Sequence, residues 1–389
     1  MEIHKTYRYR VYPTDAQKEQ LKHTFGCSRY VYNWALDMRT EAYHSDGESV
    51  GYYETKKRLT KLKKREDHDW LYNVSSVALQ ESVRNLEQVF TNFFEGRAEY
   101  PSFKSKGSGQ VAHYLKNAFT LSGDREKRPE VKLAKQSQPL DIRWSRDLGG
   151  EVKKLCVTKD ASGRYHICFT CTVEVASGEL PRAGSSVGVD LGLSDVIVTS
   201  GGYESGNPKH YHSDQKRLAK AQRRLSRKEE GSENWKKQKK RVASIHAEIE
   251  DKRQDFIHKL TTRLVKNHDV ICVESLAVKN MQQNRCLASH IADASWGNLV
   301  RQLRYKCKWH GRTLVEVDRW FPSSKRCHVC GHTRGELSLG EREWTCKECG
   351  CVHDRDKNAA ENLKQVGTAG LAGKRAAGGQ RKTSPTKVT

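Results

Sequence analysis

Hydrophobic and polar positions alternate over residues 3–11, IHKTYRYRV, which predicts a β-strand with one buried face. A helix is expected to begin soon afterwards, because Thr14 and Gln17 have the spacing of a capping box. Segments 28–43 and 78–94 repeat apolar residues at the spacing of amphipathic helices. The N-terminal part is therefore predicted to be a strand followed by several helices.

Strand patterns return in the middle of the chain. Segments 154–160 and 164–175 flank a short turn sequence that contains glycine, so we expect a β-hairpin. The polar, basic segment 98–112 is typical of a loop that touches phosphate. Residues 178–186 have the composition of a linker to a further domain.

The second half interleaves short apolar strands with long helical patterns, which indicates a domain of a different kind. Strands are expected over residues 186–192, 194–200, 269–275 and 313–318, with the first two forming a hairpin, and helices over 214–241, 256–265 and 294–311. Residues 368–389 are rich in Gly, Ala, Lys and Thr, and we predict a disordered basic tail there.

The charge of the chain indicates a polyanionic partner. Its 389 residues carry 70 Lys and Arg against 47 Asp and Glu, a net charge of +23, and nucleic acid is the commonest partner of so basic a protein. A membrane surface is the other polyanion to consider, but no apolar run approaches the length of a spanning helix, and the start of the chain lacks the apolar core of a signal peptide. We expect a cytoplasmic protein without a membrane partner.

The basic charge is concentrated in residues 214–241, which hold twelve Lys and Arg against four acids. A solvated helix face would carry charges of mixed sign, whereas this excess favours contact with phosphates. Two exposed helices are predicted here, and Arg223, Arg224 and Arg227 are the expected nucleic-acid-binding residues. Whether the phosphates belong to RNA or DNA stays open.

Four of the twelve cysteines form two Cys-x-x-Cys pairs separated by fifteen residues, namely Cys327, Cys330, Cys346 and Cys349. Two such pairs place four thiolates around one zinc ion, and a site closed by four cysteines is structural because no coordination position is left open. Cys351 does not fit the spacing. Cys168 and Cys171 are not expected to bind metal, because side chains three apart on a strand point to opposite faces.

Three acids stand where a nuclease needs them. Asp190 and Glu274 lie among apolar strand residues, and burying such an acid costs free energy unless a cation accompanies it. Asp356 stands at the expected start of a helix. Clustered carboxylates repel one another and divalent ions relieve that repulsion, so we expect Asp190, Glu274 and Asp356 to be catalytic and to bind two Mg²⁺ ions for phosphodiester cleavage.

Other acids admit simpler interpretations. Any single acid of the three could equally be a helix cap or a salt-bridge partner, and Asp354 competes with Asp356 as the third metal ligand. We interpret Asp354 as a loop residue beside the site, Asp195 as a turn residue and Asp293 as a helix cap.

A series of motifs resembles the TnpB family, which comprises transposon-encoded relatives of type V CRISPR nucleases. The motifs are, in order, CSRYVYNWAL, ALQESVRNLEQVFTNFF, YPSFKSK, GVDLGLSD, VESLAVKNM, SHIADASWGNLVRQLRYKCKWHGR, FPSSKRCHVCG, WTCKECG and HDRDKNAAENL. The resemblance covers nearly the whole chain apart from the tail. The catalytic acid of the family in the last motif matches Asp356.

The resemblance implies a multidomain fold of α/β and α+β type. The expected domains are a β-barrel wedge domain (1–13 and 120–180), a helical recognition domain (14–119), an RNase H-like RuvC nuclease domain (181–320 and 352–367) and an inserted zinc ribbon (321–351).

The resemblance also implies an RNA-guided endonuclease for double-stranded DNA. Family members bind an RNA from their own transposon end as the guide and cut next to a short transposon-adjacent motif, and we expect this chain to act as a monomer with its RNA. Positions that match the family's motif readers are Tyr52, Ser76, Gln80 and Thr120. Gln80 suits this role chemically, because its amide can make a bidentate contact with adenine.

Two other functions share parts of this pattern. A transposase that joins DNA ends would use the same carboxylates, although a zinc ribbon between the second and third acids favours the guided nuclease. A non-enzymatic, RNA-guided repressor on the same scaffold is disfavoured by the three intact acids. RNA that copurifies with the protein would distinguish the guided nuclease from the transposase.

Overall fold

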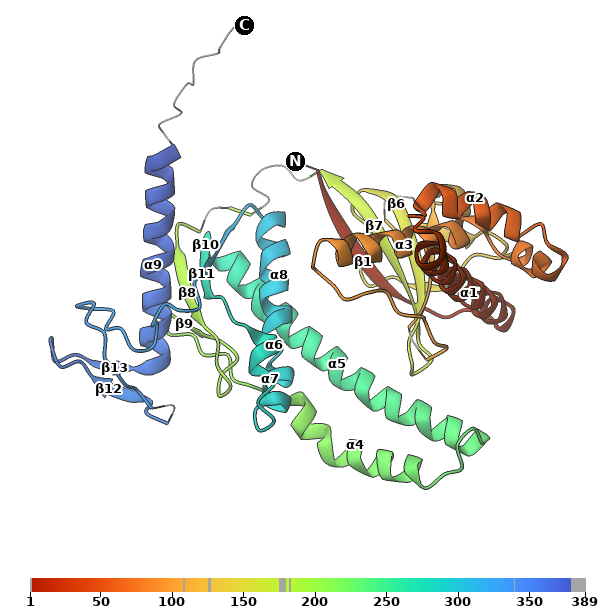
Figure 1. The fold of residues 1–389 in the computed structure, drawn as a ribbon. Helices are drawn as coiled ribbons and strands as arrows, with labels where there is room; N and C mark the ends of the chain where they lie inside the picture. The colour runs from red at the N-terminus through yellow and green to blue at the C-terminus, as the bar shows by residue number, and fades with distance from the viewer. Residues whose placement is uncertain are drawn as a thin grey trace, which may run out of the picture. The chain divides into compact units, whose positions relative to one another are not determined.

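The computed structural model describes residues 2–107, 109–124, 127–174, 180–181, 183–338 and 340–378. Contacts within the chain divide it into two units, Met1–Glu174 and Val175–Thr389, each with its own core (Figure 1). The predicted linker spans the start of the second unit, and its residues 178, 179 and 182 lie outside the described residues.

The first unit is built on a five-stranded antiparallel sheet in the order β2-β6-β7-β1-β5. Its strands are β1 (Glu2–Val11), β2 (Gln110–Leu115), β5 (Ile142–Arg143), β6 (Glu151–Lys159) and β7 (Tyr165–Glu174). The predicted first strand and the β6–β7 hairpin are confirmed. A further pair, β3 (Phe119–Ser122) and β4 (Glu130–Leu133), packs its buried residues into the same core.

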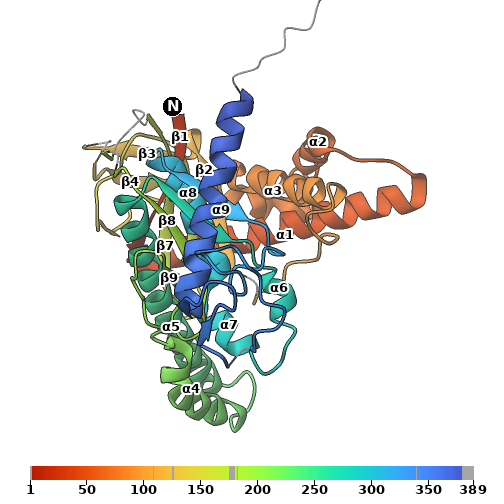
Figure 2. The same ribbon diagram turned by 90° about the vertical axis from the view of Figure 1, so that its left-hand side faces the viewer.

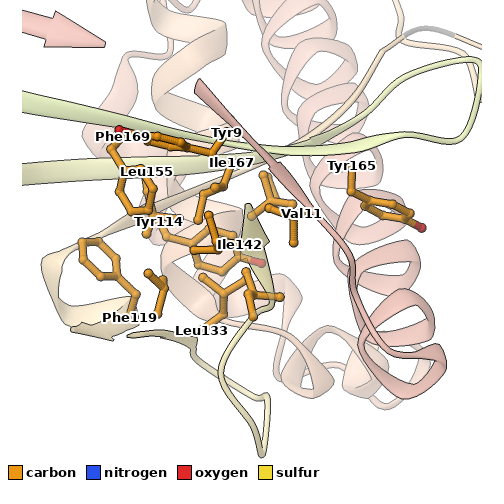
Figure 3. Close-up of a cluster of buried hydrophobic side chains, with 14 of the residues drawn as sticks. Tyr9, Val11, Tyr114, Phe119, Leu133, Ile142, Leu155, Tyr165, Ile167 and Phe169 are labelled. Carbon is orange, nitrogen blue, oxygen red and sulfur yellow. The ribbon is translucent and has the colours of Figure 1, made fainter. Parts of the chain in front are cut away.

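Alternation of side chains explains where this core lies. Tyr9 and Phe169 come from neighbouring strands, and their rings meet edge to face at 5.9 Å between centroids (Figure 3). Tyr114 on β2 and Leu133 on β4 join the same cluster. The inward residues are aromatic or branched, so burying them supplies most of the free energy that holds this sheet together.

The boundary at residue 119 between the helical and wedge domains is wrong. Strand β2 falls inside the predicted helical segment but pairs with β6, with Ala112 opposite Val157. Its pattern was easy to miss because Ala112 and Tyr114 are its only buried side chains. In the described residues the five-stranded order ends at β2 and β5, so a closed β-barrel stays a prediction.

Three α-helices of the first unit are α1 (Asp15–Asp46), α2 (Tyr52–Leu62) and α3 (Ser76–Phe94), with short 3₁₀ segments η1 (Glu66–Asn73) and η2 (Lys116–Ala118). The capping box at the start of α1 is confirmed, since the Thr14 hydroxyl accepts from the backbone N–H of Gln17 at 3.3 Å and the Gln17 side chain accepts from Thr14 N–H at 3.0 Å. The helix ends at Gly47, whose φ of 64° is left-handed and suits glycine.

The second unit contains a four-stranded sheet in the order β11-β10-β8-β9. Strands β8 (Ser186–Asp190), β10 (Val270–Glu274) and β11 (Thr313–Val317) run parallel, and β9 (Val198–Thr199) pairs antiparallel with β8. The predicted hairpin and strands are therefore confirmed, although β9 is shorter than expected. Alternate residues of β8 and β10 face opposite sides of the sheet, so each side must be covered.

Helices cover both faces of this sheet. On one face, valines of β8 and β10 pack against α5 (Glu233–Asn267) and α8 (Trp296–Trp309). The other face carries α9 (Arg355–Gly378), which lies along β8 in both views (Figure 1, Figure 2). The predicted pair of exposed basic helices is confirmed as α4 (His210–Ser226) and the start of α5. Short helices α6 (Val278–Met281) and α7 (Ala288–Ala294) precede α8.

Two glycines allow α9 to approach the sheet closely. A Cβ atom on Gly188 of β8 would lie 1.8 Å from the carbonyl oxygen of Ala360, and one on Gly367 of α9 would lie 2.3 Å from the Cys272 sulfur. No side chain fits at either distance. The glycines therefore fix the height of α9 above the strands that carry Asp190 and Glu274.

Two predicted boundaries in the second unit need correction. Helix α9 continues to Gly378, so the expected disordered tail is wrong for residues 368–378, while 379–389 lie outside the described residues. The ribbon is also longer than predicted: β12 (Glu343–Thr345) pairs with β13 (Val352–Asp354), which extends the ribbon from residue 351 to Asp354.

In the described part of the chain, no helix combines the length and apolar character needed to cross a bilayer.

Candidate nuclease and metal sites

The fold brings the three predicted acids toward one edge of the sheet. Asp190 and Glu274 are the last residues of β8 and β10, and these parallel strands pair Val189 with Val273, so the two acids end adjacent strands. Asp356 lies in the first turn of α9, which packs on β8. Three residues that are at least 82 positions apart in the sequence thus form one group, hereafter the acid cluster.

The carboxylates of the acid cluster interact with one another. Removal from water raises the pKa of Asp190 well above its usual value, and the nearby charges of Glu274 and Asp356 raise it further. Burial raises the pKa of Glu274 to about 7. It also raises the pKa of Asp356, although Arg342 opposes that rise. The nearby arginines therefore do not balance the negative charge of the three carboxylates. Such an excess of negative charge favours the binding of divalent cations.

Arg342 is a residue that sequence reasoning missed. Its guanidinium lies 3.1 Å from the Asp356 carboxylate and 3.4 Å from the Ser194 hydroxyl, although the arginine side chain is largely exposed. It stands between the two cysteine pairs of the ribbon, so the ribbon supplies a cation to the acid cluster. No sequence signal distinguishes it from the other surface arginines.

The remaining acids have structural contacts of their own. Asp354 accepts the backbone N–H of Lys357 at 2.8 Å and so caps α9, next to the cluster, as a competing candidate for the third ligand. Asp195 accepts the Gly206 N–H at 2.7 Å within a turn, as predicted. Asp293 accepts the backbone N–H of Tyr211 at 3.0 Å, so it is a helix cap as predicted, but for α4 rather than for its own helix.

The four predicted zinc ligands form a single cluster. The sulfur atoms of Cys327, Cys330, Cys346 and Cys349 all lie within 4.8 Å of one another, and no other such group occurs among the described residues. Cys327 and Cys349 are 3.6 Å apart at sulfur, as are Cys330 and Cys346. Tetrahedral zinc with Zn–S bonds of about 2.3 Å separates sulfurs by about 3.8 Å, so the donor set fits zinc.

Cys351, Cys168 and Cys171 lie apart from this cluster. Cys351 is outside the cluster and contributes its carbonyl oxygen, which accepts the Cys346 N–H at 2.9 Å. Cys168 lies opposite Cys156 across β6 and β7, whereas Cys171 is buried in the core on the other face.

The predicted phosphate-binding arginines lie at the C-terminal end of α4. Arg223, Arg224 and Arg227 are exposed, and none of them forms an ion pair with a carboxylate in the described part of the chain. Arg217, one or two turns earlier, instead pairs with Asp214 and Glu248. The end of the helix therefore presents charge that the protein does not neutralise.

Three of the four predicted motif readers lie along α3 or against it. Ser76 begins the helix and is exposed, and Gln80 follows one turn later. Arg84, one further turn along, stacks over the ring of Tyr52 at 5.3 Å and donates to its hydroxyl at 3.4 Å. Thr120 is exposed on β3. We call Tyr52, Ser76, Gln80 and Arg84 the α3 face; Arg84 was not foreseen.

Models of known families match three parts of the chain. Residues 166–285 match the OrfB_IS605 model, described as "Probable transposase", and residues 296–363 match the Cas12f1-like TNB domain. Residues 1–48 match a model described as a helix-turn-helix domain of OrfB_IS605. In the structure this last segment is strand β1 followed by the single long helix α1.

Full-length relatives and a solved structure extend these matches. A protein of Streptomyces pristinaespiralis named "Putative RNA-guided DNA endonuclease" is 46% identical over 95% of this chain and 91% of its own length. InsQ of Escherichia coli, which bears the same description, is 31% identical over 94% of this chain and 93% of its own. A Cas12f1–sgRNA–target DNA complex has a similar fold, with a TM-score of 0.58, 12% identity, and coverage of 93% of this chain and 99% of that chain.

Proposed function

Since the chain belongs to the TnpB family of RNA-guided DNA endonucleases, we propose that it cuts double-stranded target DNA at the acid cluster. The observation that carries this proposal is the placement of Asp190, Glu274 and Asp356 at one sheet edge, where burial, and then repulsion from the other two carboxylates, raises the pKa of Asp190. The partners would be a guide RNA from the transposon end and a target DNA.

The three acids would hold two Mg²⁺ ions, and the chemistry that such ions would supply is activation of a water molecule and stabilisation of the leaving oxygen of the phosphodiester. Asp190 and Glu274 are fixed by their strands, while Asp356 is carried by α9 and paired with Arg342. Arg342 would favour the ionised form of Asp356 against the effect of burial. The strands and the glycine-spaced helix would hold the backbone positions of the three acids.

The four-cysteine cluster would hold one zinc ion with a structural role. All four coordination positions would be filled by protein sulfur, so no position is left for water or substrate. The ribbon would therefore support the nuclease domain without taking part in bond cleavage.

Nucleic-acid contacts are assigned to both units. Arg223, Arg224 and Arg227 would bind phosphates, and this is supported by the observation that they form no ion pair with a carboxylate among the residues that the structure describes. The α3 face and Thr120 would read the transposon-adjacent motif, because a guide RNA cannot pair with flanking duplex and side chains must contact that DNA directly. Within this proposal the first unit comprises the wedge and recognition domains, and the protein acts as a monomer with its RNA in the cytoplasm.

One experiment tests the proposal as a whole. The protein is purified with its nucleic acid, the bound RNA is sequenced, and a plasmid with the matching target and randomised flanks is incubated with Mg²⁺. Guided activity predicts cleavage only of plasmids that match the RNA, abolished by chelation of Mg²⁺. Absence of bound RNA, together with joining of DNA ends, would support the transposase instead.

A further inference from the structure

One face of helix α9 holds the backbone of the zinc ribbon through amide side chains. Asn358, Asn362 and Gln365 are spaced one turn apart and all reach the segment from Ser323 to His328. Asn358 and Asn362 are almost completely buried, at 2% and 1% exposure, whereas Gln365 is exposed. We call this set of contacts the amide latch.

The two buried asparagines use most of their hydrogen-bonding capacity in the amide latch. The Asn358 amide nitrogen donates to the Arg326 carbonyl at 2.7 Å, and its oxygen accepts the backbone N–H of His328 at 3.1 Å. Asn362 donates to the Ser323 carbonyl at 2.9 Å. A buried amide that loses such partners keeps its desolvation cost, so these contacts depend on the shape of the ribbon backbone.

The latched segment includes a predicted zinc ligand. Arg326 and His328 are the chain neighbours of Cys327, so Asn358 holds the peptide groups on both sides of that cysteine. The buried ring of His353, just before α9, also lies 3.0 Å from the Cys327 sulfur through Nε2. The geometry of this knuckle and the start of α9 are therefore joined by side chains that do not bind the metal themselves.

The same helix turn carries an acid of the proposed nuclease site. Asp356 lies two residues before Asn358, and Arg342, which precedes β12 of the ribbon, pairs with it at 3.1 Å. A second contact joins the ribbon to this turn, since Arg355 donates to the Ser338 carbonyl at 2.9 Å. The ribbon thus contacts the first turns of α9 through its Ser323–His328 segment and through the segment between its cysteine pairs.

From these contacts we propose that Asn358 and Asn362 are positioning residues that couple metal loading of the ribbon to the placement of Asp356. The inference rests on the proposed role of Asp356 as a Mg²⁺ ligand. Zinc held by the four cysteines would fix the backbone around Cys327. The asparagines bind that backbone and would hold the first turns of α9 where Asp356 lies near Asp190 and Glu274. Replacing either asparagine would therefore weaken both the backbone geometry around Cys327 and the placement of Asp356.

The test uses Asn358→Ala and Asn362→Ala in the complete protein–guide RNA complex. We measure the rate at which a chromophoric chelator removes zinc, the Mg²⁺ concentration for half-maximal cleavage, and the affinity for target DNA. Each variant should release zinc faster and need more Mg²⁺, both by on the order of tenfold, because each leaves buried partners unpaired. Target affinity should stay within about twofold, since the latch does not contact DNA in this proposal.

Matched variants separate positioning from simple stability. Glu361→Ala alters the same helix between the two asparagines and removes an ion pair with Lys364 on the same helix. It should leave zinc release and the Mg²⁺ requirement unchanged. Gln365→Ala removes one exposed contact and should give a smaller effect of the same kind. If Asn358→Ala does not fold, Asn362→Ala and the exposed Gln365→Ala carry the test.

The outcomes distinguish this inference from the proposed function. Asparagine variants that melt at lower temperature but keep the wild-type zinc release and Mg²⁺ requirement would overturn the latch and leave the nuclease site intact. Faster zinc release without a change in the Mg²⁺ requirement would also overturn the coupling. Full cleavage by Asp356→Ala would instead overturn the proposed role of that acid.

Discussion

The acid cluster and the α3 face are both proposed to act on DNA, and they are built differently. In the acid cluster, two strand ends and a helix start bring like charges together, and the pKa of Asp190 rises because its carboxyl group is buried and because Glu274 and Asp356 lie nearby. On the α3 face, Ser76 and Gln80 are ordinary polar residues on a helix surface, and Arg84 is already paired with Glu81 and in contact with Tyr52.

The acid cluster indicates its chemistry through its structure, whereas the α3 face does not. The carboxylates of the acid cluster repel one another, and a bound cation would relieve that repulsion, so the geometry indicates a cation-binding site. The α3 face contains no such conflict, and its role rests on the positions it shares with the family. The predictions below test whether the two regions differ in function as they do in construction.

The largest effect is expected at the acid cluster. Asp190→Ala removes a metal ligand, and Glu274→Gln removes a ligand charge while keeping the shape, so either should reduce Mg²⁺-dependent cleavage by several orders of magnitude. Affinities for RNA and target DNA, measured by filter binding, should stay nearly intact. A variant that loses binding and cleavage together would mean that the acids support the fold rather than the reaction.

A paired comparison sharpens the assignment of the third acid. Asp356→Ala should abolish cleavage, whereas Asp354→Ala should retain more activity, because it removes a helix cap worth about 1 kcal/mol. Cleavage rates of the two variants at saturating Mg²⁺ check this. Should Asp354→Ala be the inactive one, the third ligand has been assigned to the wrong aspartate.

The next largest effect is expected in the ribbon. Cys327→Ser or Cys349→Ser should lose the zinc and destabilise the nuclease unit, because binding of a structural zinc contributes directly to folding. Metal analysis and thermal melting measure both consequences. Cys351→Ser and Cys168→Ser are the controls and should keep one zinc per chain; full zinc in Cys327→Ser would rule out the proposed site.

A moderate effect is expected on α4. Replacing Arg223, Arg224 and Arg227 together by Ala should lower the slope of log affinity against log salt by about three units, since each phosphate contact contributes about one. Arg217→Ala, whose guanidinium pairs with Asp214 and Glu248, should change the slope little. An unchanged slope in the triple variant would mean that this helix end is only solvated.

The smallest effect is expected on the α3 face. Gln80→Ala should alter the preference for flanking sequence in a randomised-flank cleavage library, because a base contact is worth about 1–3 kcal/mol. Gln88→Ala, two turns further along the same helix and bonded to Asn92, is the matched control. Identical flank preferences in Gln80→Ala and wild type would show that Gln80 is structural.

Sequence reasoning succeeded where a pattern had a single physical explanation. Asp190 and Glu274 stood out because each acid ends an apolar strand, and the four cysteines because of their paired spacing. Secondary structure could not be predicted correctly where a pattern had several explanations. Strand β2 buries only Ala112 and Tyr114, and residues 368–378 looked disordered although alanine favours helix and Gly367 packs against Cys272.

Residues defined by tertiary contact could not be found in this way. Arg342 resembles any surface arginine until the ribbon places it beside Asp356, and Asn358 and Asn362 are ordinary helix residues until their amides are seen to bind the ribbon backbone. Their roles depend on segments that the sequence separates and the fold brings together.

The most direct test of the acid cluster is to locate the metal itself. Crystals of the protein–guide RNA–target DNA complex can be grown with Mn²⁺ in place of Mg²⁺, and anomalous diffraction then reports the Mn²⁺ positions. If the three acids bind the metal, we expect anomalous peaks among Asp190, Glu274 and Asp356, and we expect these peaks to be lost in Asp190→Ala. A complex that cleaves DNA with Mn²⁺ but shows no peak at these three carboxylates would contradict it.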